Sequence, residues 1–253
     1  MLDEVERHGG GLLFPNEKKP NKRKHNNKNK KQIFDNRLWY APWLFKGQHS
    51  SQAGLSTSGT LTHWFKEEFA KDLKNNNIFE KLSKEAKSSP PGSNGIIFLP
   101  YFSGERTPIH DTHAKGTFFG LNLTHKRSDF YRSIFEGISY GTKHVFDTFK
   151  DLNILPNNLY SVGGGTKNKL WSKTTSDIIG INQKLRKITL GASYGDAFLS
   201  ALACKDVKKM DITKWNKVSN QIKHKKNKTY EKGYKYFREL YENTKNLMKK
   251  MDD

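Results

Sequence analysis

The chain has 253 residues and carries 45 Lys and Arg against 25 Asp and Glu, which gives a formal net charge of +20. Its one cysteine, Cys204, excludes an internal disulfide and a cysteine-based metal site, and we expect this residue to fill a buried apolar position. The sequence shows no apolar N-terminal leader and no apolar run near the length of a membrane span, so we expect a cytoplasmic chain without a membrane partner.

The positive charge is concentrated in two segments. Residues 17–31 carry a net charge of +7 and residues 205–253 carry +8, so only +5 remains for the rest of the chain. A run of Lys and Asn is typical of a solvated segment, with a nucleic-acid or targeting patch as the alternative. The charge therefore does not favour a nucleic-acid partner. We expect a poorly ordered segment at 1–31, a folded domain at 32–204, and a basic segment at 205–253 that ends in a packing helix.

The first half of the chain is predicted to hold short strands and two helices. In chain order these are a strand end or turn at 9–15, a hairpin of short strands at 33–45, a helix from about residue 60, a helix at 75–87 and a buried strand at 96–99. The first of these helices should turn Trp64, Phe65 and Phe69 inward.

The second half of the chain alternates between strands and helices. Strands are predicted at 159–162 and 187–190, and helices at 129–149, 170–179, 196–203 and 229–248. In the longest predicted helix, Ile134, Ile138 and Val145 share one face, while Gly137 and Gly141 permit a close helix crossing. Strands that alternate with helices indicate the α/β class.

A run of three glycines, Gly163, Gly164 and Gly165, marks the first candidate site. An apolar strand-like stretch precedes it, and a helix start at Asn168 follows it. A strand, a glycine turn and a helix start together aim backbone N–H groups at one point, where an anion or a nucleotide can bind. A structural strand-to-helix turn, with Asn168 as the helix N-cap, is the alternative interpretation. The small residues at 190–203 would let another helix pack beneath this glycine turn.

A second candidate lies at residues 56–60, Ser-Thr-Ser-Gly-Thr. Gly59 would let the backbone approach a phosphate, and Thr60 offers both an N–H and a hydroxyl. A plain helix N-cap by Ser58 or Thr60 explains the same residues equally well.

Several motifs in this order resemble one known family. They are Leu-Pro-Tyr-Phe-Ser-Gly-Glu-Arg-Thr-Pro at 99–108, Phe-Glu-Gly-Ile-Ser-Tyr-Gly at 135–141 and Gly-Gly-Gly-Thr-Lys-Asn-Lys-Leu-Trp at 163–171. From about Trp39 to about Lys245, the chain resembles the C-terminal half of the FGGY carbohydrate kinases. The first motif is similar to the xylulokinase-like branch.

This resemblance implies a fold and a nucleotide site. The implied fold is an α/β, ribonuclease-H-like domain of the actin and hexokinase type, the C-terminal half of a two-domain sugar kinase. The implied reaction is ATP-dependent phosphorylation of a sugar hydroxyl, with ATP and Mg²⁺ as cofactors. Gly59 and Thr60 would contact the β- and γ-phosphates. The glycines 163–165 would line the adenosine pocket, and Asn168 would hydrogen-bond the base or the ribose.

The resemblance also implies that part of the machinery lies elsewhere. The family's general base is an Asp in the N-terminal domain, which also holds the sugar, so no catalytic residue is expected in this chain. We expect the chain to be inactive alone and to meet a sugar only together with such a domain. A non-enzymatic, nucleotide- or partner-binding subunit is the alternative, and the identity of any metal ligand and the oligomeric state are left open. Glu105 and Arg106 are expected to form a structural ion pair near the cleft.

Overall fold

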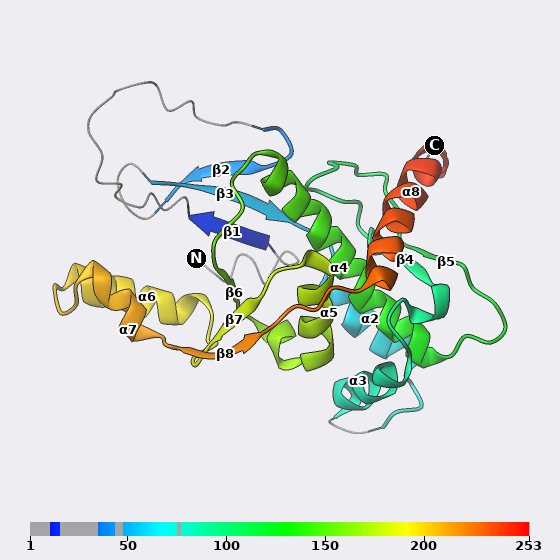
Figure 1. The fold of residues 1–253 in the computed structure, drawn as a ribbon, viewed down its shortest axis with the longest axis horizontal. Coiled ribbons are helices and arrows are strands. Elements are labelled where there is room, and N and C mark those ends of the chain that lie inside the picture. The colour runs from blue at the N-terminus through cyan, green and yellow to red at the C-terminus, as the bar shows by residue number, and fades with distance from the viewer. Residues whose placement is uncertain (1–10, 16–34, 44–47, 75–76, 253) are drawn as a thin grey trace.

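A computed structural model describes residues 11–15, 35–43, 48–74 and 77–252 (Figure 1). Most of the segment 1–31, for which poor order was expected, lies outside these residues. Among the described residues, no helix is both long and apolar enough to cross a bilayer.

Three antiparallel strands form the first sheet: β1 (Gly11–Pro15), β2 (Trp39–Pro42) and β3 (His49–Gly54), in the order β1-β3-β2. Of the hairpin predicted at 33–45, the described residues 35–43 hold one strand, β2, and its partner is β3 at 49–54. Small polar residues such as Ser50 and Ser51 are buried in β3, where Ser50 Oγ donates to the Ala41 carbonyl at 3.3 Å. A strand that buries hydroxyls gives no apolar alternation for a sequence to show.

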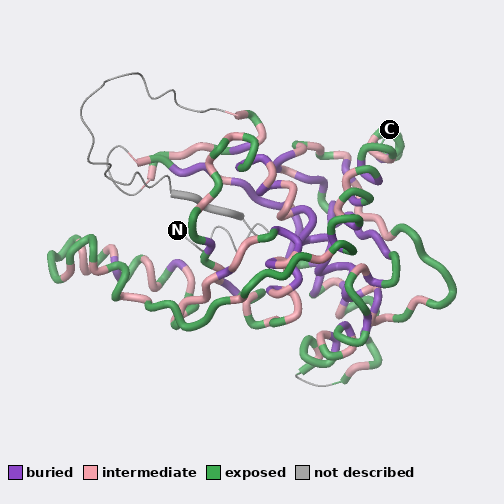
Figure 2. The backbone as a smooth tube through the Cα atoms, viewed as in Figure 1, coloured by how far each residue is buried: buried purple, intermediate pink, exposed green. Residues whose placement is uncertain are grey.

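Helix α4 (Arg127–Asp151) is the centre of the fold (Figure 2). Every residue from Tyr131 to Gly141 is buried, so this helix is enclosed on all sides rather than on one face. Around it pack α2 (Gly59–Phe69), α3 (Ile78–Ser88) and α5 (Lys169–Ile179). The helices predicted at 129–149, 75–87 and 170–179 are confirmed, with small shifts at their ends.

The inward face of α2 differs from the prediction. Leu61, Thr62 and Phe65 are buried, whereas Phe69 is 47% exposed and Trp64 is only partly buried. Phe69 instead lies against the partly buried ring of Trp64 at 5.3 Å and the buried ring of Phe65 at 5.0 Å between ring centroids. The buried face of α2 is therefore centred on Leu61 and Phe65, and the aromatic residues alone did not identify it correctly.

A short strand brings a second helix against α4. Strand β4 (Ile97–Leu99) is wholly buried and pairs antiparallel with β5 (Thr117–Phe119). Helix α8 (Lys228–Lys250) packs on β4 and on α4. Inside this junction Arg132 donates to Glu136 at 2.9 Å and to the Tyr230 hydroxyl at 2.8 Å. Because buried charges are stable only when paired, this contact fixes α8 to α4.

The last sheet carries the glycine turn. Strand β6 (Leu159–Ser161) runs parallel to β7 (Gln183–Arg186), which pairs antiparallel with β8 (Val218–Ile222). The strand predicted at 187–190 thus lies four residues too late. Strand β7 reads Gln-Lys-Leu-Arg and is mostly half-exposed, so its sequence shows no apolar pattern that would mark it as a strand.

Helix α6 (Ala192–Ala203) and helix α7 (Ile212–Trp215) extend away from the body of the molecule (Figure 1). The prediction that α6 packs beneath the glycine turn is wrong, because its Phe198 contacts Trp215 instead, at 5.4 Å between centroids. Cys204, just past the end of α6, is exposed rather than buried. The small residues of α6 therefore lie mostly on the surface.

The close contact between α4 and β4 generates the first testable prediction. A Cβ added at Gly137 would collide with the carbonyl oxygen of Phe98, and a backbone atom cannot move aside cheaply. Gly137→Ala should therefore lower the free energy of unfolding by about 1–3 kcal/mol.

The matched control is Gly195→Ala in α6, where an added Cβ meets nothing within 4 Å. Because glycine disfavours a helix interior, this change should stabilise the protein by up to about 1 kcal/mol. Urea unfolding measures both values. Equal effects of the two substitutions would contradict the close-packed crossing.

Candidate functional site

The glycine turn joins β6 to α5 through one turn of 3₁₀ helix at Gly164–Lys167. Gly163 precedes it with φ 91°, a conformation that residues with side chains rarely adopt. Asn168 then caps α5, because its Oδ1 accepts the Trp171 N–H at 3.0 Å. The N-cap interpretation of Asn168 is therefore confirmed. Its other amide atom, Nδ2, donates to Ser83 Oγ on α3 at 2.9 Å.

The surface of this turn is open on one side and supported on the other. Gly164 is exposed, and a Cβ placed there would meet nothing within 4 Å. At Gly165 an added Cβ would lie 3.2 Å from the ring of Trp171. That ring stacks on Phe135 of α4, with centroids 5.5 Å apart. The turn thus presents bare backbone to solvent above a rigid aromatic base.

The segment 56–60 leads from β3 into the first turn of α2. Ser58 occupies the N-cap position, but its side chain makes no capping hydrogen bond, and Gly59 and Thr60 are the first two helical residues. A Cβ at Gly59 would meet nothing within 4 Å, and Thr60 is exposed. The first N–H groups of a helix have no partner within the helix, and the helix dipole makes this end attractive to anions. The site can therefore take a phosphate.

Loop 100–107 forms hydrogen bonds with residues 54–57, the stretch of chain that leads into α2. Thr107 Oγ1 accepts the Gly54 N–H at 2.6 Å and donates to the Gly54 carbonyl at 3.0 Å. Arg106 donates to the Leu55 carbonyl at 3.0 Å, and the Thr57 hydroxyl donates to the carbonyl of Pro100. Sequence reasoning missed this role of Thr107, because nothing in one sequence pairs residues about fifty positions apart.

Glu105 is the one acidic residue of loop 100–107, and it is buried. Its Oε1 accepts the N–H groups of Ser56 and Arg106, each at 2.7 Å. Burial raises the pKa of this carboxyl from its usual value to about 7, against the smaller opposing effect of these hydrogen bonds. The neighbouring Arg106 places its guanidinium 5.3 Å from the Trp39 ring centroid, besides its bond to Leu55. Both side chains thus hold backbone and ring surfaces in place.

Both candidate turns rest on one hydrophobic cluster. Leu55 and Leu61 flank the segment 56–60, Leu159 begins the strand before the glycine turn, and all three belong to that cluster. Trp171 packs against it. The structure therefore brings the two predicted halves of the site onto one core.

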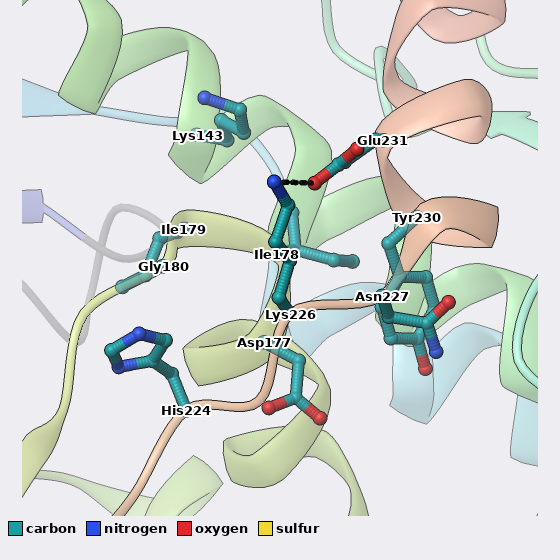
Figure 3. A pocket seen from close by; sticks show the side chains of 10 residues that line it. All are labelled: Lys143, Asp177, Ile178, Ile179, Gly180, His224, Lys226, Asn227, Tyr230 and Glu231. Atoms are coloured by element: carbon teal, nitrogen blue, oxygen red, sulfur yellow. Dashed lines mark ion pairs between the residues drawn. The ribbon is translucent and has the colours of Figure 1, made fainter.

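A cavity of about 370 Å³ lies elsewhere, where α5 ends and α8 begins (Figure 3). None of the predicted site residues lines it. Its charged side chains already have partners: Lys143 contacts Asp147 at 2.8 Å, and Lys226 contacts Glu231 at 3.6 Å. This cavity is therefore not the predicted nucleotide site.

No group of three or more metal-ligating side chains forms a metal centre within the part of the chain that the structure describes. A Mg²⁺ ion held mainly by phosphate oxygens and water needs no such group of protein ligands.

Known proteins resemble this chain in sequence and in structure. The model of the FGGY family of carbohydrate kinases, C-terminal domain, matches residues 44–204, which include all the site residues above. The xylulose kinase of Staphylococcus epidermidis is 31% identical over 194 residues, covering 75% of this chain and 38% of that protein.

Two solved structures superpose well. The xylulose kinase from Rhodospirillum rubrum has a TM-score of 0.75 at 25% identity, covering 85% of this chain and 43% of that one. The Plasmodium falciparum glycerol kinase with ADP has a TM-score of 0.70 at 24% identity, covering 82% and 42%. The chain thus spans less than half the length of these relatives.

Proposed function

Because the chain belongs to the FGGY family of carbohydrate kinases, we propose that its 253 residues form the nucleotide-binding half of an ATP-dependent sugar kinase of the xylulokinase-like branch. The α/β, ribonuclease-H-like fold predicted from the sequence is confirmed by the superpositions. The observation that carries the proposal is the open first turn of α2, held from behind by loop 100–107.

In this proposal each candidate turn binds one end of the nucleotide. The N–H groups of Gly59 and Thr60 point at the β- and γ-phosphates, where the positive end of the α2 dipole offsets their charge. The exposed backbone of Gly164 and Gly165 lines the adenosine, beside the amide of Asn168. A Mg²⁺ ion bound with the phosphates supplies further charge neutralisation in phosphoryl transfer.

Transfer to a sugar requires groups that these residues do not provide. The sugar hydroxyl must lie in line with the γ-phosphorus and lose its proton to a base. Two acidic side chains near the turn are already engaged, since Glu105 accepts backbone N–H groups and Asp111 accepts the Tyr241 hydroxyl at 2.7 Å. We propose that an N-terminal kinase domain supplies the base and the sugar site.

Nucleotide binding is the first test of this proposal. The chain should bind ADP or ATP with Mg²⁺, and Gly164→Val should abolish binding by filling the open space above the turn. Calorimetry measures the affinity of the wild type and of the variant. Ala203→Val, which also introduces a valine at an exposed position, is the control and should bind as the wild type does. Equal binding by the Gly164 variant, or none by the wild type, would contradict the assignment.

Reconstitution is the second test. The 253-residue chain alone should release no ADP in response to xylulose, ribulose, gluconate or glycerol, because loss of a general base alone lowers rates about 10²–10⁴-fold. Adding a matching N-terminal kinase domain should restore turnover in a coupled ADP assay.

The other outcomes of that assay are equally informative. Robust turnover by the chain alone would show that one of its own carboxylates acts as the base, with Glu105 and Asp111 the first to replace. Nucleotide binding without turnover in the mixture would favour the non-enzymatic, nucleotide-binding subunit.

A further inference from the structure

Glu105 has an unpaired oxygen that a purely structural role does not explain. The residue is only 4% exposed, and its Oε1 accepts two backbone N–H groups, while its Oε2 is buried without a hydrogen-bond partner. An unpaired buried carboxylate oxygen is costly, and native proteins keep few such atoms without a reason. A glutamine would accept the same two N–H groups without burying a charge.

The groups that face Glu105 leave much of its charge uncompensated. Arg106 attracts it, but this guanidinium is shared with the Leu55 carbonyl and the Trp39 ring. The buried phenol of Tyr101 also interacts electrostatically with Glu105 and offers it no opposite charge. Asp111 exchanges backbone bonds with Glu105, and its carboxylate accepts the Tyr241 hydroxyl. Burial therefore dominates, and the pKa of Glu105 rises to about 7.

This carboxyl group is hydrogen-bonded to the backbone of the segment 56–60, which leads into the first turn of α2. Its Oε1 is 2.7 Å from the nitrogen of Ser56, and Ser56 is three residues before Gly59. Three residues span at most about 11 Å of chain. Phosphates bound at the first turn of α2 would thus lie close enough to repel the Glu105 carboxylate, because buried charges are poorly screened by salt.

We propose that Glu105 is a positioning residue for phosphate binding, whose Oε1 fixes the Ser56 N–H and whose carboxyl group takes up a proton when phosphates bind. The proton comes from solvent and goes to Oε2. Oε1 is then the carbonyl oxygen of the acid and still accepts the Ser56 N–H. The inference rests on the proposed nucleotide function and adds a proton to its binding equilibrium.

The size of the effect follows from the charges. A phosphate charge on the order of 10 Å away raises the pKa of a carboxyl by about one unit at the effective permittivity of a protein. By linkage, a one-unit rise on binding makes the nucleotide bind about tenfold more weakly where Glu105 starts ionised than where it starts protonated. Affinity therefore falls as the pH rises through about 7.

The test compares three variants of the full chain with the wild type. Calorimetry with MgADP at pH 6 and pH 8, in two buffers of different ionisation enthalpy, gives both the Kd and the protons taken up. The wild type should bind about fivefold more weakly at pH 8 than at pH 6, because a carboxyl whose pKa rises from about 7 to about 8 is still partly protonated at pH 8. It should take up protons near pH 7. Glu105→Gln should bind at both pH values as the wild type does at pH 6, without that uptake.

Two further variants separate the acceptor from the charge. Glu105→Ala removes the acceptor of the Ser56 N–H and should weaken binding about tenfold at both pH values. Glu239→Gln removes an exposed carboxylate on α8 and should behave as the wild type. The titration of the nucleotide's own phosphate cancels in the difference between the wild type and Glu105→Gln, so the comparison stands even if Glu105→Ala does not fold.

Each outcome decides one claim. Binding with the same pH dependence and proton uptake in the wild type and in Glu105→Gln would overturn the role of Glu105 and leave the nucleotide site intact. An absence of MgADP binding by the wild type at both pH values would overturn the proposed function and this inference with it.

Discussion

The burial of α4 on all sides is the constraint on which the rest of the structure depends. Because Tyr131–Gly141 has no solvent-facing side, polar groups there must be satisfied inside the protein. Arg132 and Glu136 meet this need through each other and through Tyr230, which ties the C-terminal helix to the centre. At the crossing with β4, Gly137 lets the two backbones approach closely, because any side chain there would collide with the Phe98 carbonyl. Helix α4 is therefore in contact with α2, α3, α5, α8 and β4.

The same helix supports both parts of the candidate site. Phe135 carries the ring of Trp171, and this ring lies under the glycine turn. Six residues further along α4, a Cβ at Gly141 would lie 3.2 Å from Leu55, the residue that precedes the segment 56–60. An enzyme that works by positioning phosphates needs such a fixed base, because most of its rate enhancement comes from geometry and preorganised charge. Loop 100–107 adds the second support from behind, through Glu105.

The sequence predicted those features whose signals lie within one short segment and missed those that depend on distant residues. The helices were predictable because their apolar spacing and caps lie within one segment, as Asn168 illustrates. Strand β3 was missed because it buries serines, and the exposed position of Cys204 was missed because α6 leaves the core. The bonds from Glu105 and Thr107 to the chain before α2 join residues about fifty positions apart. Such contacts depend on the tertiary fold and have no local pattern.

The central claim is that one nucleotide bridges the two turns on the face that α4 supports. The most direct measurement is a crystal structure of the chain with MgADP. The account predicts phosphate density at the N–H groups of Gly59 and Thr60, and adenosine density over Gly164. Nucleotide density in the cavity between α5 and α8, lined by Lys143 and His224, would contradict it.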